Sequence, residues 1–148
     1  GMELLAVQDG ARALVTPELI DDVAEQAARC GAAAPAVAVK DTIKAVRDDG
    51  TVAETLDRAA LRAVQTPQIF ESALLKAALQ AAVETGLIRA AVEKAVEEGV
   101  TLTDDCAAVE RLGKRVYLVE GDEENLKITT PVDLILAEAI LQAREDRI

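Results

Sequence analysis

Two short apolar runs and the helix between them constrain the fold more than any other feature of the sequence. Leu4–Val7 and Ala36–Val39 have the length and composition of buried parallel strands. Between them, Thr16 is suited to cap a helix, Pro17 to occupy its first turn and Gly31 to end it. A strand, a helix and a strand in this order form a βαβ unit, whose crossover is right-handed. We therefore expect an α/β fold.

Residues 41–58 predict a structure of another kind. Thr42–Arg47 and Thr51–Thr55 are separated by Asp48-Asp49-Gly50, and an Asp-Gly pair between two strand-like runs is typical of a β-hairpin. Charged side chains are frequent here and apolar ones are few, so this hairpin has little to bury. We expect it to project from the domain as an arm.

The rest of the chain predicts further helices around one more strand. Apolar spacing indicates helical structure over residues 71–98, as one kinked helix or two, and within it Ala82–Gly86 and Ala95–Gly99 repeat at a spacing of 13 residues. Three more elements are expected: a helix capped by residues 103–105 that ends near Gly113, a strand at Val116–Val119 and a helix at Pro131–Arg144.

Composition excludes several classes of chemistry. The chain has 148 residues, which fits a single domain, and no histidine, which excludes Ser-His and Cys-His pairs and HExxH zinc sites. Cys30 and Cys106 are expected to be free thiols in a reducing cytoplasm. The longest uncharged run, Cys30–Val39, is far shorter than the ~20 residues of a membrane helix. A net charge of −11 would repel a phosphate backbone. We expect a soluble cytoplasmic domain that binds neither nucleic acid nor membrane.

Three polar clusters could carry chemistry that needs no histidine. Asp9–Arg12 follows the first strand, where α/β sheets bind ligands; its carboxylate could hold a divalent cation and its guanidinium a phosphate. Asp41-Thr42 and Asp57-Arg58 lie at the two ends of the arm. Lys127 stands between two apolar residues on a strand-like segment that follows an acidic run. Taken singly, each cluster is more typical of a solvated turn or loop than of a binding site.

In their order along the chain, these clusters resemble a known family. The sequence contains the motifs DGAR, VKDT, LDR, VQTPQ, TDD, VEGDEENLKIT and TPVDL. This succession closely resembles the 2-C-methyl-D-erythritol 4-phosphate cytidylyltransferases of the non-mevalonate isoprenoid pathway. The similarity runs from about residue 4 to residue 141 and is interrupted by the extra 13-residue segment. Ribitol-5-phosphate cytidylyltransferases share most of the motifs, so the acceptor is less well defined than the family.

The resemblance implies a Rossmann-like sheet with flanking helices and a homodimer formed through the arm. It also implies transfer of CMP from CTP to a sugar-alcohol phosphate, with Mg²⁺ bound and pyrophosphate released. Such an in-line transfer depends on positioning and on neutralising charge. The implied roles are: Asp9 as metal ligand, with Gly10 and Ala11 beside the triphosphate; Arg12, Thr42, Thr66 and Thr103 as acceptor-binding residues; Arg58 and Lys127 as catalytic residues that hold the acceptor phosphate; and Glu124 at a position where the family often has a carboxylate.

The chain also departs from the family pattern. The family's glycine-rich G-x-G-x-R-M loop and Pro-Lys-Gln sequence, which hold the CTP phosphates, do not occur here. Gln8 replaces the usual histidine and Ala13 the usual proline. We therefore expect residues 1–148 to form a single truncated domain without the amino-terminal strands. Alone it would be inactive, and activity would need a separate amino-terminal half. The alternative is a catalytically dead remnant that serves as an oligomerising or binding module.

Truncation would leave one strand at the edge of the sheet. The strand Leu4–Val7 would then carry unpaired amide and carbonyl groups and an uncovered apolar face. We expect this edge to be covered, either by a second copy of the chain or by a helix over Leu87–Glu98.

Overall fold

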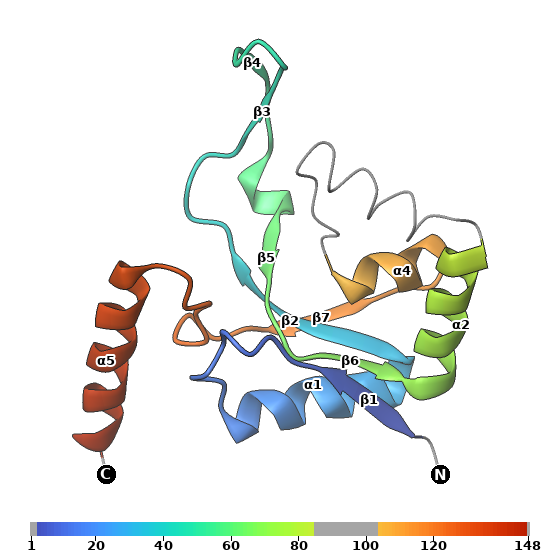
Figure 1. The fold of residues 1–148 in the computed structure, drawn as a ribbon, viewed down its shortest axis with the longest axis horizontal. Coiled ribbons are helices and arrows are strands. Elements are labelled where there is room, and N and C mark those ends of the chain that lie inside the picture. The colour runs from blue at the N-terminus through green and yellow to red at the C-terminus, as the bar shows by residue number, and fades with distance from the viewer. Residues whose placement is uncertain (1–2, 85–103, 148) are drawn as a thin grey trace.

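The computed structural model describes residues 3–84 and 104–147, which form a mixed α/β fold (Figure 1). The α/β expectation is therefore confirmed. In chain order the elements are β1 (Leu4–Val7), α1 (Pro17–Cys30), β2 (Ala32–Ala38), β3 (Lys44–Val46), β4 (Val52–Thr55), a 3₁₀ turn (Arg58–Ala60), β5 (Arg62–Val64), β6 (Gln68–Glu71), α2 (Ser72–Glu84), α4 (Asp105–Arg111), β7 (Tyr117–Glu120) and α5 (Pro131–Glu145).

Strand β2 is the centre of the sheet. Ala33 pairs with both β6 and β7, and Ala36 pairs with both β5 and β7. The antiparallel strands β5 and β6 therefore follow one another along one edge of β2, and β7 runs parallel along the other edge. Strand β1 is antiparallel to β6. This places β1 at the outer edge of the sheet, parallel to β2 but separated from it by β6.

A proline explains why β5 and β6 are two strands. Pro35 is fully buried in the middle of β2, and its carbonyl accepts a hydrogen bond from the Gln65 amide at 2.8 Å. The nitrogen and carbonyl of a strand residue point to the same edge, and proline has no N–H. The ladder therefore lacks a donor on the edge that β5 and β6 share, and the regular pairing stops there. Residues 65–67 leave the ladder at this point.

Two sequence predictions of strands need correction. Leu4–Val7 was expected to be a buried parallel strand, but β1 pairs with an antiparallel neighbour and its Leu5 is 38% exposed. No pattern in the sequence indicated β6, which takes the place beside β2. The second strand was expected at Ala36–Val39, whereas β2 spans Ala32–Ala38. Its early alanines have low strand propensity, so the sequence does not mark them as a strand, although burial fixes them in the sheet.

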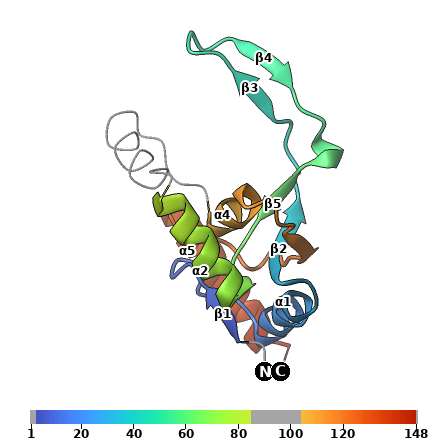
Figure 2. The same ribbon diagram turned by 90° about the vertical axis from the view of Figure 1, so that its right-hand side faces the viewer.

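Helices cover both faces of the sheet (Figure 2). On one face, Val23 and Ala27 of α1 pack against Ala33 and Ile69. On the other face, α2 and α4 pack against the remaining inward side chains of β2 and β6; this second cluster contains Ala32, Ala34, Phe70, Leu75, Ala78, Cys106 and Val109. Successive alanines of β2 thus face opposite layers, as the two-residue repeat of a strand requires. Cys30 and Cys106 are both free thiols, as expected.

The expected helix ends and caps are largely confirmed. Thr16 caps α1, whose second residue is Glu18, and Gly31 ends it with a φ of 90°. Asp104 is the cap of α4, within the predicted 103–105 segment. Thr130 caps α5 through a capping box with Asp133. The expected strand at Val116–Val119 is β7, one residue later.

The predicted hairpin is present and projects from the body of the domain (Figure 2). Strands β3 and β4 pair with each other and with no other strand of the described residues. They are shorter than the predicted runs. Val46 and Val52 on the arm are 67% and 49% exposed. Whether residues 41–58 join two copies of the chain stays a prediction.

Helix α5 lies beside the sheet and buries little (Figure 1). Ala137 is its one buried residue, while five of its large apolar side chains are exposed: Val132, Leu134, Ile135, Leu136 and Leu141. No helix in the described part of the chain has the length and hydropathy to cross a membrane. The 13-residue repeat, Thr103 and the expected covering helix at Leu87–Glu98 lie outside the described residues, apart from Ala82–Glu84 at the end of α2.

Gly121 continues the pairing of β7 with β2 and leaves no room for a side chain. Its amide donates to the Ala36 carbonyl at 2.8 Å. A Cβ atom at this position would lie 2.9 Å from the Ala36 carbonyl carbon and 2.8 Å from Gln65 Oε1. Because the Ala36 backbone belongs to the central strand, it cannot easily give way.

We predict that Gly121→Ala lowers the free energy of unfolding by about 1–3 kcal/mol, since the added methyl group forces the two strands apart. Urea denaturation measures the loss. Gly10→Ala is the matched control, because a Cβ there meets nothing within 4 Å. Its expected change stays within about 0.5 kcal/mol. Equal losses in the two variants would contradict the steric explanation.

Candidate functional site

Three loops meet where β1 and β7 end and where residues 65–67 leave the ladder. The amide of Asp9 donates to Thr66 Oγ1 at 3.0 Å, which joins the loop after β1 to residues 65–67. The amide of Ile128 donates to the Ala11 carbonyl at 2.8 Å, which joins the loop after β7 to the loop after β1. The structure thus brings together four residues that the sequence predicted as site residues. We call Asp9, Arg12, Thr66 and Lys127 the strand-end site.

The ion pair between Asp9 and Lys127 is the central contact of the strand-end site. Lys127 Nζ lies 3.0 Å from Asp9 Oδ2, and Asp9 Oδ1 accepts the amide of Ala11 at 3.1 Å. The hydrogen bond from Lys127, followed by that from Ala11, holds the pKa of Asp9 below its ordinary value. The side chain of Lys127 remains 53% exposed, so its charge is open to an anion. The segment that carries it is an irregular loop and not the strand-like run expected from the sequence.

Part of the Arg12 guanidinium is already bonded within the chain. Its Nη1 donates to the backbone carbonyl of Asn125 at 2.6 Å, and its Nε is buried without a hydrogen-bond partner among the described residues. Burial lowers the pKa of Arg12, and the charge of Asp9 opposes that shift. The guanidinium stays protonated at neutral pH. Arg12 thus adds positive charge beside Asp9 and also ties the loop after β1 to Asn125.

Two buried amide side chains at this site were missed by the sequence analysis. Asn125 is fully buried; its Nδ2 donates to the Thr66 carbonyl at 2.9 Å and to Gln65 Oε1 at 3.4 Å. Gln65 is 6% exposed and bonds both the carbonyl and the amide of Asp122. Each lies inside a motif that was noticed, VQTPQ or VEGDEENLKIT. Polarity in a loop predicts exposure, so nothing in the sequence marked them as buried.

Glu124 faces α5 and not the strand-end site. Its carboxylate accepts hydrogen bonds from Arg144 Nε at 3.0 Å and Arg147 Nη2 at 3.1 Å. Arg144 also donates to the Leu14 carbonyl at 3.1 Å. The hydrogen bonds from Arg144 and Arg147 lower the pKa of Glu124. In this chain the carboxylate therefore anchors α5; its predicted family role is not tested by these contacts.

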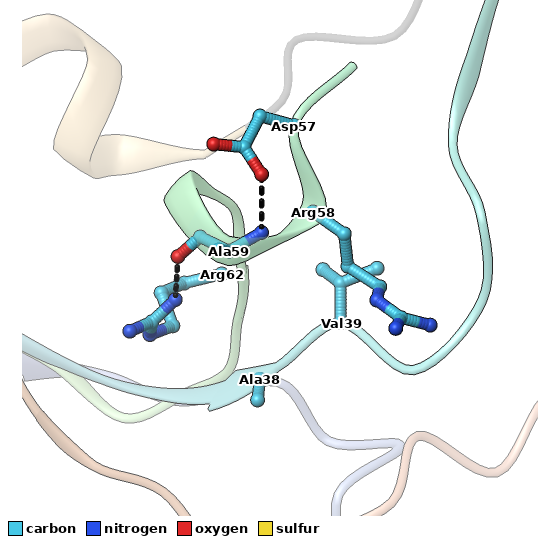
Figure 3. Close-up of a pocket in the computed structure, with 6 residues that line it drawn as sticks. All are labelled: Ala38, Val39, Asp57, Arg58, Ala59 and Arg62. Atoms are coloured by element: carbon cyan, nitrogen blue, oxygen red, sulfur yellow. Dashed lines mark hydrogen bonds between the residues drawn. The ribbon is translucent and has the colours of Figure 1, made fainter. Parts of the chain in front are cut away.

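A pocket with charged side chains lies at the base of the arm. It has a volume of about 430 Å³ and is lined by Ala38, Val39, Asp57, Arg58, Ala59 and Arg62 (Figure 3). The guanidinium groups of Arg58 and Arg62 lie on opposite sides of it. Arg58 donates to the Lys40 carbonyl, so it joins the two ends of the arm. Thr42 is exposed near the start of the arm.

Within one chain, the base of the arm adjoins the loop after β7, because Lys40 Nζ lies 2.7 Å from Glu123 Oε1. No described hydrogen bond or ion pair joins Arg58 or Thr42 to the strand-end site. The hypothesis that Arg58 and Lys127 converge on one anion across two copies of the chain stays a prediction.

The strand-end site fits a magnesium ion whose other ligands are mainly the phosphates of a nucleotide. In the described part of the chain no three acidic, cysteine or histidine side chains gather into a metal-binding group. Mg²⁺ is commonly held by one or two carboxylates together with substrate phosphates and water. Asp9 is a half-buried carboxylate at the end of a strand and can supply one such ligand.

The fold and the site define an α/β protein with a Rossmann-like sheet, an acid–lysine pair at the strand ends and a projecting hairpin. Solved cytidylyltransferases have this fold. The chain matches the crystal structure of the 2-C-methyl-D-erythritol 4-phosphate cytidylyltransferase from Thermus thermophilus with a TM-score of 0.75 and 39% identity, over 94% of this chain and 62% of that one. The enzyme of that name from Francisella tularensis matches with a TM-score of 0.76 and 31% identity, over 91% and 58%.

Sequence comparison identifies the family. Residues 2–143 match the model described as IspD: 2-C-methyl-D-erythritol 4-phosphate cytidylyltransferase, and the chain belongs to this family. The relative of that name from Desulforamulus reducens is 48% identical over 142 residues, which are 96% of this chain and 55% of the relative. The relative from Caldanaerobacter subterraneus is 46% identical over 95% of this chain and 56% of its own length. The chain thus spans about half the length of the curated relatives it matches.

We predict that acid loosens α5. The lowered pKa of Glu124 means that its ion pairs contribute stability above its ordinary pKa, and that this contribution is lost as the pH falls through the lowered value. Glu124→Gln should make stability less dependent on pH in this range. Thermal unfolding measured from pH 3 to pH 7 tests this. The control is Glu145→Gln, an exposed residue of the same helix. Identical pH profiles for the wild type and Glu124→Gln would contradict the role of this anchor.

Proposed function

We propose that this chain forms the acceptor-binding part of a cytidylyltransferase that transfers CMP from CTP to 2-C-methyl-D-erythritol 4-phosphate. The observation that carries this proposal is the Asp9–Lys127 pair, 3.0 Å apart at the strand ends with Thr66 beside it. It offers a carboxylate and a half-exposed ammonium group within one site. A phosphoryl transfer between two anions needs both, one for a metal-bound triphosphate and one for the acceptor phosphate.

The proposed reaction is an in-line displacement. A phosphate oxygen of the acceptor attacks the α-phosphorus of CTP, a new P–O bond forms, and the bond to the β-phosphate oxygen breaks so that pyrophosphate leaves. Lys127 holds the acceptor phosphate and offsets its charge, and Arg12 and Thr66 orient the acceptor. Asp9, with Gly10 and Ala11 beside it, would hold Mg²⁺, which supplies charge neutralisation at the triphosphate when bound. No proton acceptor is required, which suits a chain without histidine.

Under this proposal, the arm residues of one copy of the chain contact the acceptor bound to a second copy. Thr42 and Arg58 lie outside the strand-end site of their own chain, and the arm extends well beyond the sheet (Figure 2). Arg58 of one copy would grip the acceptor in the site of another. Thr103 is proposed as a further acceptor-binding residue.

The chain contains no glycine-rich G-x-G-x-R-M sequence. We therefore propose that the reaction also needs a segment that carries the triphosphate-binding loop. The relatives extend well beyond the part matched here, which supports this. A catalytically dead binding module is the second candidate. It is favoured by the edge of β1, which is free within the described residues, and by the five exposed apolar side chains of α5.

Pyrophosphate release in the presence of CTP, Mg²⁺ and methylerythritol phosphate tests the proposal. We expect no turnover by residues 1–148 alone and measurable turnover when the part of the Desulforamulus reducens relative that they do not match is supplied. Ribitol 5-phosphate as acceptor tests the alternative substrate in the same assay. Absence of turnover in every combination would contradict the enzymatic proposal and favour the binding module.

We predict that Arg58→Ala weakens the binding of methylerythritol phosphate by about 1.5–3 kcal/mol, because one charge-assisted contact to phosphate is lost. Titration calorimetry measures this. Arg29→Ala is the matched control, since Arg29 carries the same charge but pairs with Glu25 on α1. Unchanged affinity for the Arg58 variant would exclude Arg58 from the acceptor site.

A further inference from the structure

We infer that the buried side chain of Asn125, supported by Gln65, is a positioning residue that sets the geometry of the strand-end site. The catalytic meaning of this inference rests on the proposed function. The positioning itself can be tested without turnover.

Asn125 is in contact with all three loops of the site. It belongs to the loop after β7 and stands two residues before Lys127. Its backbone carbonyl accepts Arg12 Nη1 at 2.6 Å, and its Nδ2 donates to the Thr66 carbonyl at 2.9 Å. Asn125 therefore bonds two members of the strand-end site, Arg12 and Thr66.

The orientation of the Asn125 amide is fixed by its neighbours. Both groups that its Nδ2 reaches, the Thr66 carbonyl and Gln65 Oε1, are acceptors, so the nitrogen must face them. Its Oδ1 is buried and has no hydrogen-bond partner in the described part of the chain. A buried unpaired oxygen is costly. The contacts of Asn125 are thus those of a donor that bridges two loops.

Gln65 extends the same network to the centre of the sheet. Its backbone amide is bonded to Pro35 of β2, and its side chain accepts the Asp122 amide at 3.2 Å and donates to the Asp122 carbonyl at 2.8 Å. The start of the loop after β7 is therefore fixed to the central strand through a buried amide. The rest of that loop, from Asn125 to Lys127, is fixed through Asn125.

These links reach Asp9 and Lys127 indirectly. Thr66 Oγ1 accepts the Asp9 amide, and the Ile128 amide is bonded to Ala11. If the Nδ2 donor of Asn125 is removed, the Thr66 carbonyl loses it and Gln65 Oε1 keeps only the Asp122 amide. The loop after β7 can then shift relative to residues 65–66. The separation of Lys127 from Asp9 is no longer fixed.

Asn125→Leu tests the inference, because it keeps the number and branching of the side-chain heavy atoms and removes the Nδ2 donor. Amide hydrogen exchange should speed up at Asp9 and Ile128 by about tenfold beyond the loss of global stability, which corresponds to one buried hydrogen bond. Affinity for methylerythritol phosphate should fall by about the same factor. Val23→Ala is the control: Val23 of α1 is fully buried, and its core cluster with Ala27, Ala33 and Ile69 includes no residue of the strand-end site. It should lower global stability without a selective effect at Asp9 and Ile128.

Exchange at Asp9 and Ile128 that follows the global loss in Asn125→Leu, as in the control, would overturn the inference. Asn125→Ser is the second variant if the leucine variant does not fold, because its short hydroxyl cannot reach both acceptors. Exchange and binding separate the two proposals. A wild-type chain that does not bind methylerythritol phosphate would contradict the proposed function, while the exchange pattern would still decide the role of Asn125.

Discussion

The absence of an N–H group at Pro35 shapes both the sheet and the site. Pro35 is buried in the central strand, and the ladder that this strand forms with β5 and β6 is interrupted there. The chain leaves the sheet at residues 65–67 and turns polar groups inward at that point. Gln65 and Thr66 are thereby placed where the loops after β1 and β7 arrive. The strand-end site lies at this interruption of the ladder.

The sheet tolerates this interruption because its centre is packed closely on both sides. Four alanines of β2 are fully or almost fully buried and let α1 approach one face and α2 with α4 the other; they are Ala32, Ala33, Ala34 and Ala36. The polar loops are held in a different way, by buried hydrogen bonds to Gln65 and Asn125 and by the anchor of Arg144 on Glu124. Such directional contacts fix side-chain positions to a few tenths of an ångström, which a site for a charged acceptor requires. The apolar core stabilises the fold, and the buried amides of Gln65 and Asn125 fix the positions of the loops of the strand-end site.

Local signals in the sequence predicted the elements that depend on local chemistry. The cap at Thr16, the glycine end at Gly31, the Asp-Gly hairpin and the terminal helix after Thr130 all appear where they were expected. Prediction was poorer where tertiary contacts decide. Strands β5 and β6 have three and four residues and no distinctive pattern, and they form because β2 offers them an edge. The predicted parallel pairing of β1 was wrong for the same reason, because its neighbour β6 forms only through tertiary contacts.

By itself, the sequence determined the helices, the hairpin, the family and the candidate residues Asp9, Arg12, Thr66 and Lys127, because caps, turns and motifs depend on neighbours along the chain. The tertiary structure alone decided which of these residues meet. It joined Asp9 to Lys127 across most of the chain, left Arg58 and Thr42 on the arm, and turned Glu124 towards α5. It also buried Gln65 and Asn125, whose polarity had suggested exposure. Burial and long-range pairing depend on the whole fold, and no short stretch of sequence contains that information.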